Sequence, residues 1–219
     1  MNRLSTLLAL LGFVSCAVVS ADSNKPVGIS ADLMSVEVIH NGKTLKISRN
    51  QDNKNQVIPD YAITSRPCPP FCIRPIKLAP GVETIGELEM LDYLVAAGKD
   101  PDILVIDSRT PDWVAKGTIP GSVSIPWTLL NPDTSDPITI GEIMENQFGA
   151  NQSDELWDFS EAKTLVLFCN GTWCGQSPRN ILTLLRYGFP ANKIKWYRGG
   201  MQDWEVLGLT TVPGSAGTK

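Results

Sequence analysis

Short apolar runs alternate along this chain with segments in which apolar residues recur at helical spacing. Turn-forming or polar residues bound each of the apolar runs, which cover residues 103–106, 123–125, 165–168 and 194–197. Runs of this length are typical of buried strands. Helical spacing predicts helices in the segments between and after them, at residues 88–95, 111–116, 140–148, 178–185 and 201–207. The alternation predicts an α/β fold in which helices flank a parallel sheet.

The residues before this pattern, 22–80, are expected to form an N-terminal extension. Two β-prone runs, 36–39 and 44–47, flank Asn41-Gly42, and Asn-Gly between such runs is a strong hairpin signal. Five prolines between residues 65 and 80 exclude a regular helix or a central strand. We therefore expect a β-hairpin followed by a Pro-rich arm, which serves as a plain linker or as a lid or docking arm. The main domain is expected at residues 81–213, with a short tail at 214–219.

Residues 1–21 resemble a secretory signal peptide. Arg3 precedes an apolar stretch that is short for a membrane-spanning helix, and Val19-Ser20-Ala21 offers a small-residue cleavage site. This pattern predicts a periplasmic or secreted protein without a membrane span. Lipoprotein anchoring at Cys16 is a weaker alternative, because Phe13 stands where a Leu is expected.

The charge of the chain argues against two classes of partner. The formal net charge is −4, and removal of the leader, whose only charged side chain is Arg3, makes it −5. A mixed, net negative surface lacks the basic footprint of proteins that bind nucleic acid or anionic lipid.

The candidate chemistry lies in residues 165–180, LVLFCNGTWCGQSPRN. Cys169 directly follows a predicted buried strand, and Gly171 and Gly175 let the next segment bend sharply. Ser177 and Pro178 are typical of a helix N-cap and of a first helical residue. A thiol at the end of a strand and close to a helix N-terminus is expected to have a depressed pKa and raised nucleophilicity.

Four cysteines remain after removal of the leader: Cys68, Cys72, Cys169 and Cys174. In an oxidising compartment they allow three disulfide connectivities, and each close pair could form a small ring. A zinc site is disfavoured, because neither spacing is Cys-x2-Cys and no His lies near either pair. No metal and no cofactor is expected.

Several motifs together resemble the rhodanese-like domain family, the sulfurtransferase fold, over about residues 82–212. They are the strand that ends in Asp107-Ser108-Arg109, the segment 117–122 with Thr118 where the family usually has His, and the closing Gly199-Gly200 with Trp204. The active-site loop departs from the family. Seven residues separate Cys169 from Ser177, where about six are usual, and one of the seven is Cys174.

The resemblance implies that Cys169 is the catalytic nucleophile of a sulfurtransferase. It would take sulfur from a small sulfane-sulfur donor as a persulfide and pass it to an acceptor thiol, which a protein could carry. Structural roles are expected for Asp107, Arg109, Cys68 and Cys72. The expected substrate-binding residues are those of the loop and the first helical turn: Asn170, Gly171, Thr172, Trp173, Gly175, Gln176, Ser177 and Arg179.

Two other interpretations stay open. Cys174 could act as a resolving thiol for Cys169, which would make the protein a thiol–disulfide redox protein. Alternatively, the chain is a non-catalytic binding domain. A phosphatase is disfavoured because no Arg stands at the Cys-x5-Arg position after either loop cysteine, and a Cys protease because His40 is the only histidine.

Overall fold

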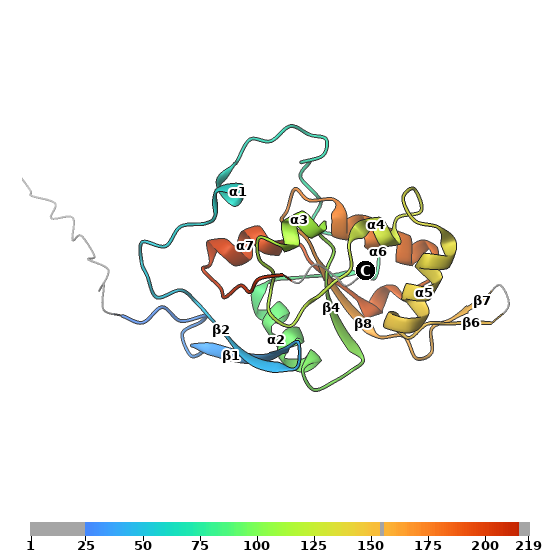
Figure 1. Ribbon diagram of the computed structural model, residues 1–219, viewed down its shortest axis with the longest axis horizontal. Coiled ribbons are helices and arrows are strands. Elements are labelled where there is room, and N and C mark those ends of the chain that lie inside the picture. The colour runs from blue at the N-terminus through green and yellow to red at the C-terminus, as the bar shows by residue number, and fades with distance from the viewer. Residues whose placement is uncertain (1–24, 154–155, 215–219) are drawn as a thin grey trace, which may run out of the picture.

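The computed structural model describes residues 25–153 and 156–214 and has a five-stranded parallel sheet at its centre (Figure 1). The predicted α/β class is therefore confirmed. The predicted signal peptide and residues 215–219 of the predicted tail lie outside the described residues. In spatial order the strands are β3 (Glu83–Ile85), β9 (Ile194–Tyr197), β8 (Thr164–Phe168), β4 (Ile103–Asp107) and β5 (Val123–Ser124).

The sheet contains one strand that the apolar pattern did not predict. β3 has only three residues and pairs with β9 in parallel at one edge of the sheet. Its sequence, Glu-Thr-Ile, is too short and too polar to stand out as a buried run. The other four strands lie within a residue of their predicted bounds.

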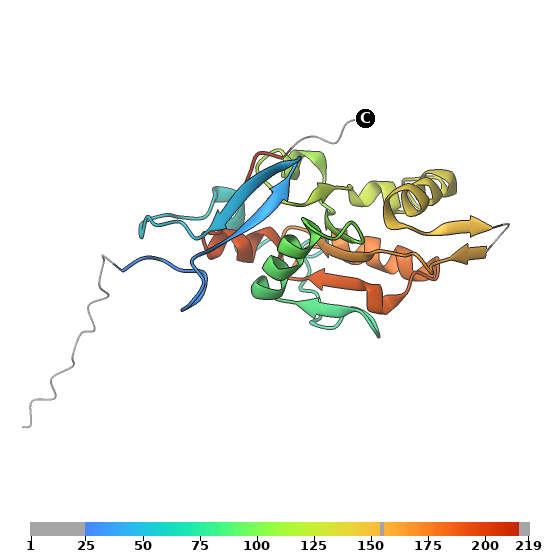
Figure 2. The ribbon, with the colours of Figure 1, turned by 90° about the horizontal axis from the view of Figure 1, so that it is seen from below.

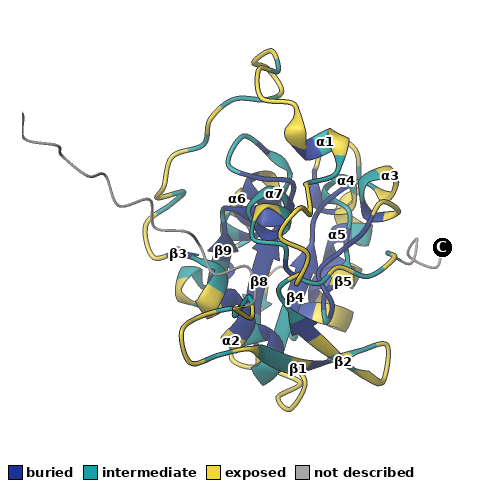
Figure 3. Ribbon diagram, turned by 90° about the vertical axis from the view of Figure 1, so that its left-hand side faces the viewer, coloured by how far each residue is buried: buried dark blue, intermediate teal, exposed yellow. Residues whose placement is uncertain are grey.

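Alternate residues of the central strand β8 face two different helical layers. Leu165 and Leu167 pack in a core with residues of α4 (Trp127–Leu130), α5 (Pro137–Phe148) and α6 (Gln176–Arg186). Val166 and Phe168 pack in a second core with α2 (Glu87–Ala97) and α7 (Gly200–Val206). All four side chains are buried, as the dark blue β8 in Figure 3 shows. A strand covered on both faces reads as a continuous apolar run, which is why its pattern was visible.

The predicted hairpin is present and covers α2. β1 (Ser35–His40) and β2 (Lys43–Ser48) pair antiparallel, and the blue hairpin lies beside the green α2 in Figure 2. Val38 and Ile47 are buried in the same core as the α2 side chains. His40 Nδ1 accepts a hydrogen bond from the Gly121 N–H at 3.1 Å. The first part of the extension thus packs against the main domain.

The Pro-rich arm follows α1 (Pro59–Ala62) and has no helix or strand between residues 63 and 82. It runs along the upper edge of the molecule in Figure 1, and a disulfide joins Cys68 to Cys72. None of the described helices is long and apolar enough to cross a bilayer.

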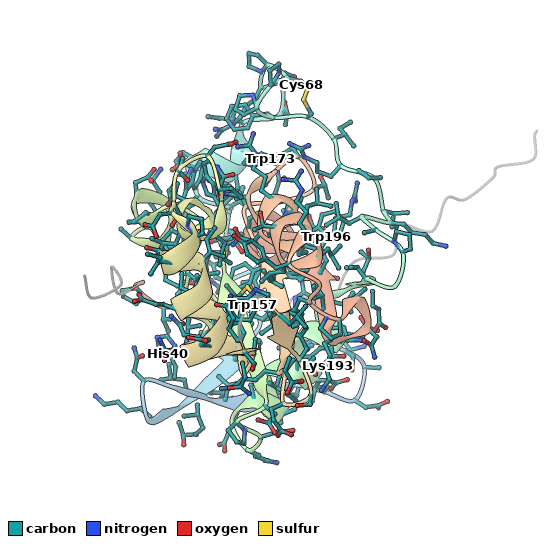
Figure 4. All side chains as sticks on the ribbon, turned by 90° about the vertical axis from the view of Figure 1, so that its right-hand side faces the viewer. His40, Cys68, Trp157, Trp173, Lys193 and Trp196 are labelled. Atoms are coloured by element: carbon teal, nitrogen blue, oxygen red, sulfur yellow. A yellow bond between two sulfur atoms is a disulfide. The ribbon has the colours of Figure 1, made fainter. Side chains whose placement is uncertain are left out.

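The remaining short elements are a helix, an antiparallel pair of strands and a 3₁₀-helix, η1 (Ala191–Lys193), which precedes β9. α3 (Pro111–Val114) follows β4, and an antiparallel pair, β6 (Asn151–Ser153) and β7 (Leu156–Asp158), precedes β8. Trp157 of β7 and the neighbouring Phe159 pack against the core on the α5 side. The Trp157 ring is well separated from Trp173 in Figure 4. This part of the molecule therefore supports the core rather than the loop.

Candidate active site

Cys169 directly follows β8, at the carboxyl end of the central strand of the sheet. Its neighbours along the sheet fix this end, because β4 and β9 pair with β8 on either side up to Phe168. Ligands of open α/β sheets bind at such strand ends. The Cys169 side chain is 2% exposed, so the sulfur lies beneath the loop of residues 170–176 rather than on the surface.

Ser177 does not cap the helix as the sequence pattern indicated. Helix α6 begins at Gln176, its N-cap is Gly175, and no side chain caps it. The Ser177 side chain is buried and its hydroxyl instead donates to Cys169 Sγ at 3.2 Å. Placing Ser177 inside the first helical turn turns its hydroxyl toward the sulfur, and the helix N-terminus itself points at the same atom.

The surroundings of Cys169 favour its ionised form. Burial opposes ionisation, but hydrogen bonds from the Cys174 thiol, the Ser177 hydroxyl and the backbone N–H groups of Ser177 and Gly171 outweigh it. Together they lower the pKa of Cys169 from 9.0 to about 7. Hydrogen bonding to the charged form favours it. At neutral pH a large fraction of Cys169 is therefore the nucleophilic thiolate.

Cys174 is placed to remain a thiol. Burial, the hydrogen bond with Cys169 and the negative charge of that residue raise the pKa of Cys174 well above its ordinary value. Its sulfur also lies 3.6 Å from Gln176 Oε1. Since a thiol has one proton, Cys169 and Gln176 compete for it. Both cysteines are free thiols in this structure, so the loop holds one ionisable and one protonated sulfur side by side.

A buried tyrosine from the extension holds the start of the loop. The Tyr61 hydroxyl donates to Asn170 Oδ1 at 3.0 Å and accepts from Arg109 Nη1 at 3.1 Å. Burial raises the pKa of Tyr61, so the hydroxyl keeps the proton that it donates to Asn170. Asn170 was predicted to contact substrate, and in this structure its Oδ1 accepts the Tyr61 bond.

Asp107 and Arg109 form a buried ion pair below this tyrosine. Arg109 Nη2 lies 2.6 Å from Asp107 Oδ2, and both side chains are 1% exposed. The Thr118 hydroxyl, at the position where the family usually has His, donates to the same carboxylate oxygen at 2.7 Å. Burial disfavours the charge on Arg109, but Asp107 offsets this and raises the Arg109 pKa. Tyr61 connects the pair to the loop, because its hydroxyl contacts both Arg109 and Asn170.

Gly200, the second of the two closing glycines, lets helix α7 approach the loop backbone. The N–H groups of Met201 and Gln202 donate to the carbonyls of Cys169 and Asn170, each at 2.9 Å. Gly200 has φ +57°, and a Cβ there would collide with the Cys169 carbonyl oxygen. Only glycine fits this position. The start of α7 therefore anchors the carbonyls on either side of the Cys169–Asn170 bond.

The arm packs directly against the loop, although the two are distant in sequence. The rings of Phe71 and Trp173 meet edge to face with centroids 5.1 Å apart. Figure 4 shows Trp173 at the same end of the molecule as Cys68, far from His40. Trp173 Nε1 donates to Gln202 Oε1 at 2.7 Å, so this ring is fixed from both sides. A cavity of about 300 Å³ lies between arm and loop, lined by Ile63, Thr64, Arg66, Phe71, Ile73, Thr172, Trp173 and Gln202.

The positive charge at the loop comes from an unexpected element. Arg179 was predicted to bind substrate, and its guanidinium lies over the Trp127 ring, 5.0 Å from the centroid. Arg74 of the arm lies against the loop instead, with its guanidinium on Gly175. The Arg74 N–H also donates to the Thr172 carbonyl at 2.9 Å. Within residues 25–153 and 156–214, no group of three or more His, Cys, Asp and Glu side chains is placed to hold a metal ion.

A comparison with models of protein families identifies the family of the chain that carries this site. The model of the rhodanese-like domain family matches residues 90–206, more than half of the chain. The chain belongs to the rhodanese-like domain family. Cys169, its loop and the Asp107–Arg109 pair all lie within the matched residues, and the rhodanese-like fold is that of sulfurtransferases.

Two solved structures are similar to this rhodanese-like chain. One is a protein of unknown function from Rhodopseudomonas palustris CGA009, described as a possible tyrosine phosphatase. The TM-score is 0.37 and the sequence identity 21%, and the match covers 62% of this chain and 84% of that protein. The other is the human single-domain sulfurtransferase TSTD1. The TM-score is 0.35 and the sequence identity 21%, and the match covers 56% of this chain and 95% of TSTD1. No curated protein matches the chain.

Several residues at the site were not found from the sequence. Tyr61 and Arg74 lie before residue 90, outside the rhodanese-like match, in segments that read as polar loop or Pro-rich arm. Trp196 donates to the Ser177 hydroxyl at 3.2 Å. The sequence pattern could have indicated this residue, because it lies in a predicted buried strand, and in the structure Trp196 pairs in register with Leu167 of β8. Gln202 had no such signal.

Proposed function

We propose that this rhodanese-like protein is a sulfurtransferase that carries a sulfane sulfur as a persulfide on Cys169 in an exported compartment. The observation that carries the proposal is the setting of Cys169. Its sulfur accepts a hydrogen bond from the Ser177 hydroxyl and lies at the N-terminus of α6. The pKa of Cys169 is lowered to about 7. A thiolate stabilised by fixed donors is the nucleophile that sulfur transfer needs.

The proposed reaction has two displacement steps. In the first, the Cys169 thiolate attacks the outer sulfur of a donor such as thiosulfate. A new S–S bond forms, the S–S bond of the donor breaks, and sulfite leaves with the electron pair. In the second, an acceptor thiolate attacks the outer sulfur of the Cys169 persulfide and releases the Cys169 thiolate. The donors that favour ionised Cys169 also stabilise the persulfide anion.

Burial of the nucleophile restricts the way in which sulfur reaches it. Cys169 is 2% exposed and Cys174 is 4% exposed. A donor or an acceptor, whether small or carried on a protein, must therefore enter through the loop or displace the arm. We propose a chemical class for the sulfur donor and for the acceptor thiol, and not particular molecules.

Two features support an exported location. Residues 1–21 have the pattern of a signal peptide. Cys68 and Cys72 form a disulfide, and disulfides persist in oxidising compartments. The proposed location is the periplasm or the extracellular space.

The contact between the two loop cysteines favours a second candidate function. Cys174 hydrogen-bonds to Cys169, and the two pKa values are shifted in opposite directions. In a redox protein, Cys169 would attack a partner disulfide and release one partner thiolate. Cys174 would then attack the mixed disulfide, which reduces the partner fully and leaves a Cys169–Cys174 disulfide.

One assay on two states of the protein separates these functions. We expect sulfur transfer from thiosulfate to be low in oxidised protein and to appear after reduction of a Cys169–Cys174 disulfide, located by peptide mapping. Equal and high activity in both states would contradict gating by this disulfide. Reduction of a protein disulfide without sulfur transfer would favour the redox protein. The absence of both activities in both states would favour a binding domain.

A further inference from the structure

The guanidinium of Arg74 lies against Gly175 of the active-site loop, in the space that a side chain at position 175 would enter. A Cβ built on Gly175 would lie 2.5 Å from Arg74 Nη2 and 3.1 Å from its Cζ. A side chain at position 175 would therefore displace the guanidinium, which is the far end of a flexible side chain. Gly175 is also the residue that precedes α6, so the cation lies where the helix N-terminus begins.

The backbone of Arg74 is held from two sides. Its N–H donates to the Thr172 carbonyl at 2.9 Å, and its carbonyl accepts from Arg198 Nη2 at 2.6 Å and from Arg198 Nε at 3.2 Å. Arg198 directly follows β9, which is part of the central sheet. The arm therefore presents Arg74 to the loop in a defined position.

The charge of Arg74 is not satisfied by the protein. No carboxylate in residues 25–153 or 156–214 lies within ion-pair distance of its guanidinium, and its Nε is buried without a hydrogen-bond partner. Arg109 is a useful contrast, because it is buried and donates to both oxygens of Asp107. A buried, unpaired N–H group of a cation is costly unless a ligand supplies the acceptor. Arg74 thus has the free donors of an anion-binding residue.

We infer that Arg74 forms an anion subsite at the mouth of the Cys169 loop and determines specificity for sulfur donors whose leaving group is anionic. The inference rests on the proposed function, because it names the class of donor that Cys169 uses. The Cys169 thiolate attacks the outer sulfur of the donor, the donor S–S bond breaks, and the inner sulfur leaves with the electron pair. Arg74 holds the charged end of this leaving group, while Cys169 keeps the transferred sulfur.

A pair of donors that differ at one end tests the subsite. The probes are 2-sulfonatoethyl persulfide and 2-hydroxyethyl persulfide, which share their sulfur atoms and carbon chain. The measurement is the second-order rate of persulfide formation on Cys169, by mass spectrometry of prereduced protein. We expect the sulfonate donor to react about tenfold faster, the size of one charge-assisted hydrogen bond. A change in the Cys169 pKa acts on both donors alike, so the ratio of the two rates reports recognition of the charged end.

Four variants assign the preference to one side chain. Arg74→Ala is expected to reduce the ratio to about one, and Arg74→Lys to restore part of it. Gly175→Ala keeps Arg74 but displaces its guanidinium, and should also lower the ratio. The matched control is Arg186→Ala, which removes the same charge from the exposed far end of α6 and should leave the ratio unchanged. A ratio that survives Arg74→Ala would overturn the subsite.

A binding measurement separates failure of the subsite from failure of sulfur transfer. Ethanesulfonate contains no transferable sulfur, and it should slow alkylation of Cys169 by iodoacetamide in the wild type but not in Arg74→Ala. If neither persulfide loads Cys169 while this protection is seen, the proposed function fails and the anion subsite stands. If the wild type and Arg74→Ala are protected equally, or neither is protected, the subsite is overturned.

Discussion

The indole nitrogen of Trp196 lies 3.2 Å from the hydroxyl oxygen of Ser177 and sets the direction in which that hydroxyl donates. An indole nitrogen only donates, so the Ser177 oxygen accepts this bond and turns its own proton toward Cys169 Sγ, 3.2 Å away. All three residues are buried. The relay joins β9, α6 and the end of β8, and it fixes a donor on the sulfur of the proposed nucleophile.

Removal of the Ser177 hydroxyl should make Cys169 harder to ionise. In Ser177→Ala the Cys169 pKa is expected to rise from about 7 toward its ordinary value of 9.0. Only the thiolate reacts, so alkylation of Cys169, followed by peptide mass spectrometry, should reach half its maximum at a higher pH. Trp196→Phe keeps an aromatic ring but loses the N–H, and a smaller shift in the same direction is expected.

Ser153→Ala is the matched control, because it removes an exposed hydroxyl from β6, outside the loop and α6. Its alkylation profile should superimpose on that of the wild type. A Ser177→Ala profile that also superimposes would remove the hydroxyl from the account of Cys169 reactivity.

Local sequence pattern was enough to predict β8 and the position of Cys169, because a strand covered on both faces is apolar throughout. The same pattern gave the wrong role for Ser177, because whether this residue is the N-cap or lies in the first turn depends on the residue at which α6 starts. Tyr61 and Arg74 could not be predicted, because their partners in the loop lie far along the chain. Tyr61 contacts Asn170, 109 positions later, and Arg74 contacts Thr172, 98 positions later. Such contacts depend on the path of the extension and leave no periodic signal.

The Tyr61 hydroxyl should contribute to stability through its two buried hydrogen bonds. Tyr61→Phe leaves Asn170 Oδ1 without its donor, and we expect the free energy of unfolding to fall by about 1–3 kcal/mol. Urea denaturation measures this loss. Tyr187→Phe is the control, since its ring packs against Trp157 and no side-chain hydrogen bond is found for it among the described residues. Equal stability of the two variants would show that the Tyr61 bonds add nothing.

Gly200 should be intolerant of any side chain. Gly200→Ala combines a positive φ with a collision against the Cys169 carbonyl, and we expect a loss of at least about 2 kcal/mol in the free energy of unfolding. Gly141→Ala in α5 is the matched control. A Cβ there would lie 3.7 Å from the Trp157 ring, an ordinary contact, so this change should be neutral or stabilise by about 0.5–1 kcal/mol. Thermal or urea unfolding that ranks the two variants in the opposite order would contradict this account of α7 and the loop.

The Cys68–Cys72 disulfide should stabilise the arm without taking part in sulfur transfer. Replacing both residues by Ser is expected to lower the free energy of unfolding by about 2 kcal/mol, as for a small closed ring. Since Phe71 of this ring packs on Trp173, a looser arm should also let a bulky maleimide reach Cys169 faster. The persulfide yield at saturating donor should stay unchanged per folded molecule. Loss of that yield in a folded variant would place the pair in the chemistry.

The most direct test of the central claim is the location of the transferred sulfur. Prereduced wild-type protein, Cys169→Ser and Cys174→Ser are incubated with thiosulfate, and fragment-ion mass spectrometry locates any added sulfur within the peptide that holds both positions. The account predicts one added sulfur atom on Cys169 in the wild type and in Cys174→Ser, and none in Cys169→Ser. Sulfur that is retained in Cys169→Ser and lost in Cys174→Ser would contradict it.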